Sequence, residues 1–393
     1  MEKQIDYVFI TGMFRSGTTL LGRMLNAHKN IAIASDPCMP LFKNFRSDIA
    51  KEIGQEVPTN MPLDDYYFSK DKLNLKESIE SATFEFEFKN NSGELKKQLV
   101  SHGSPFCPKL TENVEKINGR TYTELLESIL CLTREQYGDK KTRVVGFKDV
   151  WTDEFIRPLS KSFPNMKFIQ ILRDPRAVAS SKNSRKAKYP WIFLARQWRK
   201  LASYAWHYQN DKFQKPRVLL IYYEDLIREP ERAAKNICSY LNLEYDSNMV
   251  DLDNYVDGEG KSWRQNTAYG QGEKKFNEKN IDKWRSVLKE EEVKLIELFC
   301  QFEMNLHNYE CDNHHKEIPS EFIFNAPKIQ EDNLADWIKK LIKNDELSSV
   351  VEMNKETLRY SLVHDKKDSN IDIDLSKGCF LFSDMYNWLK VKK

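Results

Sequence analysis

A glycine-rich segment near the start of the chain has the residues of an anion-binding loop. An apolar run at Tyr7–Thr11 leads into Gly12-Met-Phe-Arg-Ser-Gly17-Thr18-Thr19, and residues of helical spacing follow. In a strand–loop–helix arrangement, backbone N–H groups and the helix dipole can hold an oxyanion. A turn that merely needs glycine is the simpler explanation, but such a turn has no need of an arginine, a serine and two threonines together.

The loop lacks the lysine of a nucleoside triphosphatase. Its two glycines have the spacing of the P-loop GxxxxGK[ST], but Thr18 stands at the lysine position. That lysine normally reaches the β- and γ-phosphates, so its loss argues against hydrolysis of ATP or GTP. Arg15 supplies a cation inside the loop instead and can form two hydrogen bonds with a tetrahedral oxyanion.

A second cationic segment follows another predicted strand. The strand ends at Arg173, Asp174-Pro175 then begins a helix, and Ser181 and Arg185 are four residues apart and should share a helix face. Ser181 should lie about two turns into this helix. A solvated basic helix face is the alternative. Two anion sites at neighbouring strand ends nevertheless suit a nucleotide with phosphates at both ends of its ribose.

The elements that position these residues predict an α/β fold with a central parallel sheet flanked by helices. Apolar, β-branched or aromatic runs, each followed by a helical pattern, occur at 7–11, 31–35, 143–148, 167–173 and 217–223. Residues 43–140 are interpreted as a helical insertion on the acceptor side of a domain spanning 1–310. Residues 255–275 are expected to be a loop. Residues 311–393 should be a C-terminal extension or small appended region, with a helix at 334–343.

The overall composition limits the classes of partner. The net charge of +2 over 393 residues gives no general attraction to nucleic acid or membranes. Seven scattered cysteines without a CxxC pair indicate reduced thiols, and no Cys/His pattern predicts a metal site. Neither a signal peptide nor an apolar run of 18 residues is seen. We therefore expect a cytoplasmic protein without membrane insertion, nucleic acid or metal, and the sequence leaves its oligomeric state open.

Both motifs resemble those of one known family. FRSGTT after a strand resembles the 5′-phosphosulfate loop of sulfotransferases that use 3′-phosphoadenosine-5′-phosphosulfate (PAPS), and ILRDPRAVASSKNSR resembles their 3′-phosphate motif. The tyrosylprotein and carbohydrate branches look most similar. The resemblance covers roughly residues 5–36 and 143–290. It implies the P-loop-like sulfotransferase fold, with PAPS as co-substrate.

The resemblance also implies which residues bind the nucleotide. It places Arg15, Ser16, Gly17, Thr18 and Thr19 on the 5′-phosphosulfate and Arg173, Ser181 and Arg185 on the 3′-phosphate. Tyr223 matches a tyrosine that lines the nucleotide. Lys283 is the best-matched position of the segment that closes over PAPS, whereas the contacts of residues 264–275 stay open.

Two further residues match catalytic positions of the family. Counted without gaps from Gly17, Asp36 falls where the tyrosylprotein branch has its catalytic glutamate, and it should emerge beside the glycine loop as a general base. Aspartate is one methylene shorter, and a turn at Asp36-Pro37 is the alternative to a base. Lys148 resembles a lysine of the carbohydrate branch and could stabilise the bridging oxygen, or it could simply extend from a strand end towards solvent. His28 is expected to be structural.

These observations predict a sulfotransferase that moves a sulfuryl group from PAPS to a hydroxyl or amine by in-line attack. Arg15 would hold the transferring group, Asp36 would accept the proton, and Lys148 would lie near the leaving phosphate. The acceptor could be a small molecule, a carbohydrate or a peptide. Two alternatives stay open: a P-loop kinase-like phosphotransferase, and a catalytically inactive protein that binds PAPS or its product PAP (adenosine 3′,5′-bisphosphate).

Overall fold

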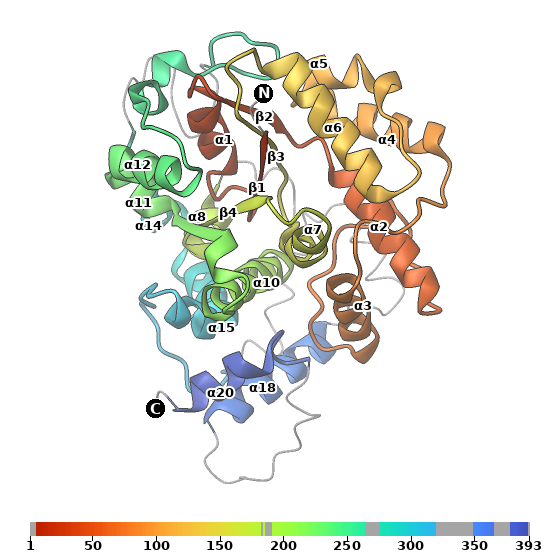
Figure 1. Ribbon diagram of the computed structural model, residues 1–393. Helices are drawn as coiled ribbons and strands as arrows, with labels where there is room; N and C mark the ends of the chain where they lie inside the picture. Colours follow the sequence, from red (N-terminus) through yellow and green to blue (C-terminus); the bar gives the residue numbers. More distant parts are fainter. Residues whose placement is uncertain are drawn as a thin grey trace. The chain divides into compact units, whose positions relative to one another are not determined.

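A five-stranded parallel sheet organises the computed structural model of the chain (Figure 1). The structure describes residues 5–181, 184, 191–263, 276–319, 349–364 and 378–391. The strands are β1 (Asp6–Gly12), β2 (Ile31–Ser35), β3 (Val144–Lys148), β4 (Lys167–Leu172) and β5 (Val218–Tyr222). Their order is β2-β3-β1-β4-β5, and all four pairings are parallel. The carboxyl ends of all five strands therefore lie along one edge of the sheet.

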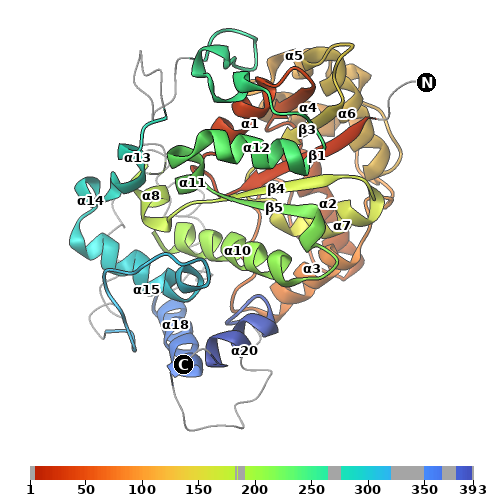
Figure 2. The same ribbon diagram turned by 60° about the vertical axis from the view of Figure 1, so that its left-hand side comes forward.

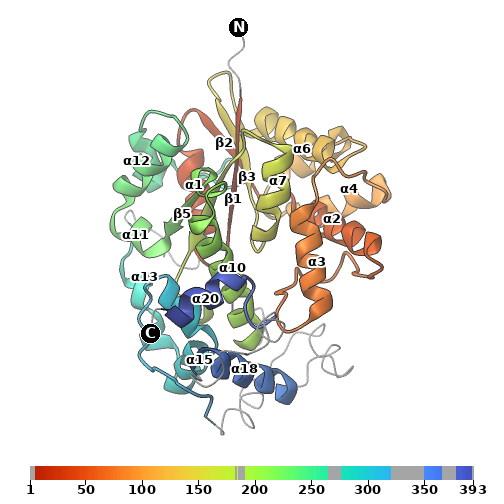
Figure 3. The same cartoon turned by 60° about the horizontal axis from the view of Figure 1, so that its bottom comes forward.

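Helices make up most of the rest of the described structure. Those up to residue 162 are α1 (Thr18–Asn26), α2 (Met39–Glu52), α3 (Lys70–Ser81), α4 (Ser92–Gly103), α5 (Pro108–Thr111), α6 (Tyr122–Tyr137) and α7 (Ile156–Ser162). Those that follow are α8 (Pro175–Ser180), α10 (Trp191–Asn210), α11 (Tyr223–Arg228), α12 (Pro230–Tyr240), α13 (Lys279–Asp282), α14 (Trp284–Val287), α15 (Glu290–Leu306), α18 (Ser349–His364) and α20 (Ser383–Val391). Helices α1, α11 and α12 lie on one side of the sheet, and α2, α6 and α7 lie on the other (Figures 2 and 3).

An aromatic cluster holds the sheet to the helices. The register sets Phe9 of β1 beside Phe147 of β3 and Phe168 of β4, and the rings of Phe9 and Phe147 stack with centroids 4.7 Å apart. Phe42 of α2 packs 5.8 Å from Phe9 and stacks on Phe155 at 4.6 Å. Buried aromatic rings contribute large apolar areas and prefer such offset contacts. This cluster fixes α2 against the strands that carry the loop.

The predicted strands and the α/β class are confirmed, with strand ends within one residue of the expected positions. The predicted helix start at Pro175 is also confirmed, with the proline in the first turn. Between residues 43 and 140 the structure contains α3, α4, α5, α6 and most of α2, in agreement with the expected helical character of this segment. The predicted helix at 334–343 lies outside the described residues.

The chain divides into two compact units. The sheet belongs to the first, which comprises 1–63, 75–173 and 208–280. The second comprises 64–74, 174–207 and 281–393. Within it, Arg199 pairs with Glu356 of α18 at 2.8 Å, and Arg359 of α18 pairs with Glu303 of α15, all four side chains being fully buried. Removing one partner of such a pair is strongly destabilising, so α18 is held firmly to its unit. The expected division of the chain at residue 310 stays a prediction.

Candidate active site

The glycine loop adopts a backbone that its glycines make possible. Gly12 has φ 156°, and a Cβ atom there would lie 2.4 Å from the carbonyl oxygen of Ile171 on β4. Gly17 has φ 93°, and a Cβ atom there would lie 2.5 Å from the ring of Tyr223. Arg15, between them, also has a positive φ of 69°. The loop is thus a tight turn that only glycine permits at its two ends.

The loop leads into a helix N-terminus that no side chain caps. Helix α1 begins at Thr18, and its N-cap, Gly17, offers no side-chain hydrogen bond to the first backbone N–H groups. The hydroxyl of Ser16 is buried and has no hydrogen-bond partner within the described residues. Uncapped N–H groups together with a positive helix end favour an anion. The expected anion-binding geometry of Ser16, Gly17 and Thr18 is therefore present, with Thr19 in the same first turn.

Two arginines meet beside this loop. The guanidinium of Arg173, at the end of β4, donates to the backbone oxygens of Arg15 at 3.0 Å and Asn280 at 2.7 Å, and it lies 4.0 Å from the ring centroid of Tyr223. Burial lowers the pKa of Arg15, and the neighbouring charge of Arg173 lowers it further. Two cations held together in a buried position disfavour each other unless an anion joins them. The structure thus brings Arg15, Arg173 and Tyr223 together.

The second motif departs from its prediction beyond Arg173. Asp174 caps α8 by accepting from the N–H of Arg176 at 2.8 Å, as expected. Helix α8, however, ends at Ser180, and Ser181 is its C-cap with ψ 134°. The expectation that Ser181 lies two turns into a helix is therefore wrong. The physical reason is that the hydroxyls of Ser180 and Ser184 donate to carbonyls of the last helical turn, at 3.0 and 2.8 Å, which competes with continuation of the helix. Arg185 lies outside the described residues.

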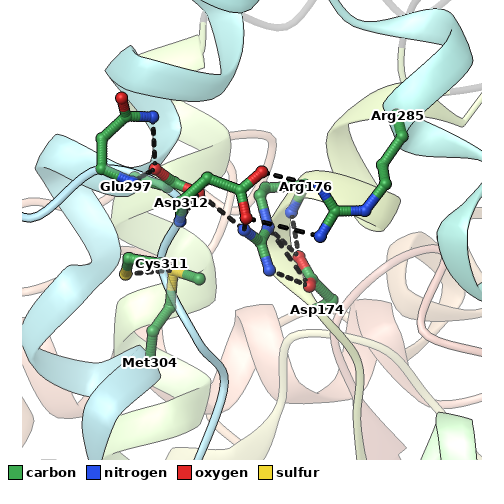
Figure 4. Close-up of polar contacts among 8 residues, drawn as sticks. Asp174, Arg176, Arg285, Glu297, Met304, Cys311 and Asp312 are labelled. Carbon is green, nitrogen blue, oxygen red and sulfur yellow. Dashed lines mark hydrogen bonds and ion pairs between the residues drawn. The ribbon is translucent and has the colours of Figure 1, made fainter.

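An ion-pair network fixes the start of α8 within the second unit (Figure 4). Arg176 pairs with Asp174 at 2.7 Å and with Glu297 of α15 at 2.6 Å, and its guanidinium lies 4.1 Å from the ring centroid of Trp284. These carboxylates raise the pKa of Arg176 above its ordinary value, although burial opposes them. Lys283, which was predicted to contact the nucleotide, is the exposed N-cap of α14 next to Trp284.

Asp36 and Lys148 form a buried ion pair at the ends of β2 and β3. Ser35 and Lys148 are partners in the sheet register, and the N–H of Asp36 donates to the carbonyl oxygen of Lys148 at 2.6 Å. The ammonium of Lys148 pairs with Oδ2 of Asp36, and the two residues are 2% and 8% exposed. Asp36 has a positive φ of 52°. Both therefore lie at the sheet edge that carries the glycine loop, as predicted for Asp36.

His28 is structural, as expected. It follows α1 rather than lying inside it, and its ring contacts the carbonyl oxygen of Glu244 at 2.9 Å and accepts from the N–H of Asn30 at 3.0 Å.

Two further residues around this pair were not predicted as site residues. Asp149 is fully buried and accepts from the N–H of Cys38 at the start of α2, at 2.9 Å. Burial raises the pKa of Asp149 well above its ordinary value, and the charge of Asp36 adds to the rise. Helix α4 supplies His102, whose buried Nε2 has no partner among the described residues. Burial lowers the pKa of His102, while Asp36 opposes the shift.

The sequence offered little signal for these residues. Asp149 adjoins Lys148 in the chain, which could have pointed to it. His102 belongs to the segment 43–140, where no motif is recognisable.

The arrangement combines an anion-binding loop with a carboxylate and an ammonium at the same sheet edge. Such a site can hold a negatively charged donor group and take a proton from an attacking hydroxyl. Within the described ranges, no cluster of three or more His, Cys, Asp or Glu side chains is placed to hold a metal ion. No described helix is both long and apolar enough to cross a membrane.

Comparison with known proteins gives one consistent result. The model of the sulfotransferase family matches residues 7–247. A putative protein-tyrosine sulfotransferase of Caenorhabditis briggsae is 21% identical over 295 residues, which are 74% of this chain and 84% of the relative. Protein-tyrosine sulfotransferase A of Caenorhabditis elegans is 22% identical over 349 residues, 86% of this chain and 76% of the relative. Among solved structures, the sulfotransferase domain from the curacin biosynthetic pathway aligns with a TM-score of 0.46 at 15% identity, covering 78% of this chain and 99% of that domain. Since the family model covers more than half of the chain and includes both the glycine loop and the β4–α8 motif, this protein belongs to the sulfotransferase family.

Proposed function

We propose that this protein transfers a sulfuryl group from PAPS to the phenolic hydroxyl of a tyrosine in a protein or peptide. The observation that carries the proposal is the contact between Arg15 and Arg173 beside an uncapped helix N-terminus. Two guanidiniums that lie this close favour the binding of an anionic ligand, because the charge of Arg173 disfavours the charge of Arg15. The relatives named as protein-tyrosine sulfotransferases support tyrosine as the acceptor.

The residues present fit a ligand with two anionic ends. The 5′-phosphosulfate would bind the loop from Arg15 to Thr19, where the Ser16 hydroxyl lacks a partner. The 3′-phosphate would bind Arg173 at the end of β4. The ring of Tyr223 packs against both Gly17 and Arg173, so it would line the nucleotide between these two groups.

PAPS supplies the activated sulfuryl group, and the protein supplies positioning and charge. Asp36 is the general base: one of its carboxylate oxygens accepts the proton of the tyrosine hydroxyl as that oxygen attacks. Lys148 holds Asp36 in place through the buried ion pair. Arg15 and the N–H groups at the start of α1 neutralise negative charge that shifts towards the leaving phosphate. Burial of these groups strengthens each of the electrostatic effects.

The proposal is tested by incubating the full chain with sulfur-35-labelled PAPS and a library of tyrosine-containing peptides. Each peptide has a partner in which phenylalanine replaces tyrosine. We expect label in the tyrosine peptides only, and mass spectrometry should locate a sulfate ester on the ring oxygen. Label on the phenylalanine partners, or on a carbohydrate set run in parallel, would refute the tyrosine acceptor. Stabilisation by PAP without transfer to any acceptor would refute catalysis and leave a nucleotide-binding protein.

A further inference from the structure

The side chain of Asp149, which follows β3, holds the start of α2 from outside that helix. Helix α2 begins at Met39, and its N-cap, Cys38, offers no side-chain hydrogen bond to the first backbone N–H groups. Oδ2 of Asp149 accepts from the N–H of Cys38 at 2.9 Å, and both residues are fully buried. The first N–H groups of a helix have no partner inside it, so Asp149 takes the place of the missing cap.

This hydrogen bond lies two residues beyond the proposed base. The connection from β2 to α2 consists of Asp36, Pro37 and Cys38. At its first residue, the N–H of Asp36 donates to the carbonyl oxygen of Lys148 at 2.6 Å. At its last residue, the N–H of Cys38 donates to Asp149. Two consecutive residues of the chain therefore hold both ends of the connection, and the proline between these ends restricts it further.

The backbone of Asp36 depends on such contacts. Its φ of 52° lies in the left-handed region, which is strained for residues other than glycine. A strained conformation persists only where the surrounding structure enforces it. Without an acceptor for the N–H of Cys38, the connection would be free to relax towards a negative φ at Asp36. That change would turn the Asp36 carboxylate in another direction.

Asp149 is itself fixed to the strand that carries the glycine loop. Its N–H donates to the carbonyl oxygen of Ile10 on β1 at 3.1 Å, and the N–H of Trp151 donates to the carbonyl oxygen of Gly12 at 3.1 Å. The indole N–H of Trp151 donates to Sδ of Met13 at 3.1 Å. Residues 149–151 therefore follow the end of β1 into the loop, and Asp149 connects this loop to the start of α2.

We infer that Asp149 is a positioning residue: its hydrogen bond with the N–H of Cys38 sets the Asp36 carboxylate relative to the glycine loop, and its negative charge is not needed for the transfer. This inference rests on the proposed function, in which Asp36 takes the proton. Asp149 acts through the β2–α2 connection and not on the reacting atoms. Burial raises the pKa of Asp149 well above its ordinary value, so a neutral side chain with an acceptor oxygen suits this position.

The test compares substitutions that keep or remove the acceptor oxygen. Asp149→Asn keeps an oxygen for the N–H of Cys38 and removes the charge, whereas Asp149→Leu keeps the branching and removes the acceptor. In Asp149→Leu we expect kcat to fall by about 10–100-fold, because a misplacement of about 1 Å can cost about 100-fold, while calorimetric PAP affinity stays within about twofold of wild type. Asp149→Asn should keep kcat within about threefold of wild type.

A matched control removes a helix cap elsewhere in the first unit. Thr121 caps α6 by accepting from the N–H of Glu124 at 3.2 Å, so Thr121→Val should lower stability and leave kcat unchanged. Asp149→Ala, which leaves room for a water molecule, is measured beside Asp149→Leu. Failure of both of these variants to fold where Thr121→Val folds would overturn the inference, because Asp149 would then be required for the fold itself.

Two further results would contradict the positioning role. A folded Asp149→Leu with kcat within about threefold of wild type would mean that Asp149 contributes to stability alone. Equal losses of kcat in Asp149→Asn and Asp149→Leu would mean that the charge is required, and that the hydrogen bond from Cys38 does not explain the effect.

A second measurement needs no transfer and separates the inference from the proposed function. Hydrogen exchange of the full chain, saturated with PAP and followed by mass spectrometry, reports on the backbone N–H groups of residues 36–42. Exchange there should be faster in Asp149→Leu than in wild type, Asp149→Asn and Thr121→Val. Equal exchange in wild type and Asp149→Leu would overturn the inference. Absence of transfer by wild type to every acceptor would overturn the proposed function, and the exchange rates would then decide on Asp149 alone.

Discussion

The two halves of the sheet edge handle buried charge in opposite ways. At the ends of β1 and β4, Arg15 and Arg173 are two cations in one neighbourhood. At the ends of β2 and β3, Asp36 and Lys148 are an anion and a cation that pair with each other. The first half concentrates positive charge, whereas in the second half a positive and a negative side chain form an ion pair.

This difference in charge suggests that one half of the sheet edge binds the nucleotide and the other half takes part in the chemical step. An anionic ligand that lies between Arg15 and Arg173 is attracted by both cations. The residues at the ends of β1 and β4 should therefore contribute most of the affinity for the nucleotide. The ion pair of Asp36 and Lys148 has no net charge and therefore contributes little to the binding of an anion. It holds the Asp36 carboxylate where the acceptor hydroxyl would lose its proton. Changes on the β2/β3 side should therefore reduce the rate and leave nucleotide affinity almost unchanged.

The largest expected effect concerns the base. Asp36→Asn should lower kcat by about 10²–10⁴-fold, the usual loss when a general base is removed, with PAP affinity nearly unchanged. The measurement is kcat beside calorimetric PAP affinity on the same preparation. Because the variant leaves Lys148 buried and unpaired, Asp36→Asn with Lys148→Met is the matched control, which should recover stability but not rate. A rate within about threefold of wild type would show that another group takes the proton.

The next effect is on affinity. Arg173→Ala should weaken PAP binding by about 2–4 kcal/mol, because a buried phosphate loses its charged partner. Adenosine-5′-phosphosulfate, which lacks the 3′-phosphate, should lose far less. Arg120→Ala, at an exposed arginine ahead of α6, serves as the control for removal of one positive charge. Equal losses for both ligands in calorimetry would contradict the assignment of Arg173 to the 3′-phosphate.

A comparison of ligands tests the nature of the β1/β4 side. At about one hundred times its dissociation constant, PAP should raise the free energy of unfolding by about 2.7 kcal/mol, and ATP with Mg²⁺ at the same concentration should raise it much less. The reason is that Thr18 replaces the lysine that a triphosphate requires. Thermal melts with the two nucleotides provide the measurement. Equal stabilisation would favour the kinase-like alternative.

The smallest effect concerns Lys43 of α2, on the acceptor side. Burial, and then Arg46, lower the pKa of Lys43 from 10.5 to about 8. Between these two pH values the unfolded chain keeps a proton that the folded protein has released, so the contribution of Lys43 to stability rises with pH. From pH 7.5 to 9.5, the free energy of unfolding of the wild type should rise by about 1 kcal/mol relative to that of Lys43→Met, after allowance for solvent screening.

Urea unfolding at both pH values provides that measurement. Lys51→Met, at an exposed lysine of the same helix, is the control and should show no such gain. A gain as large in the control would mean that the effect does not come from burial of Lys43.

The nucleotide half of the site could be predicted because neighbouring residues in the chain encode it. Gly12 and Gly17 permit a backbone that other residues cannot adopt, and the arginine between them stays within the same turn. Asp174-Pro175 begins α8 by the same local rules. The prediction that this helix continues to Ser181 was wrong. Serine hydroxyls donate to the backbone carbonyls of its last turn, and α8 therefore ends before Ser181.

The acceptor half could be predicted only in part. Asp36 was found from its distance to Gly17 along the chain, yet its pairing with Lys148, 112 residues away, was not. His102 and Asp149 carry little sequence signal of their own, because each gains its meaning from what surrounds it. A histidine in a polar helix is unremarkable until that helix packs against the end of β2.

The sequence by itself determined the strands, the glycine loop, the position of Arg173 and the family, since all of these depend on contiguous residues with strong conformational or chemical constraints. Only the tertiary structure decided that Arg15 and Arg173 share one neighbourhood and that Asp36 and Lys148 compensate each other. The physical reason is the strand order β2-β3-β1-β4-β5, which sets residues far apart in the chain side by side along one sheet edge. The strand order and the helices packed on the sheet decide which charged side chains are buried together. A pattern of neighbouring residues in the sequence does not contain this information.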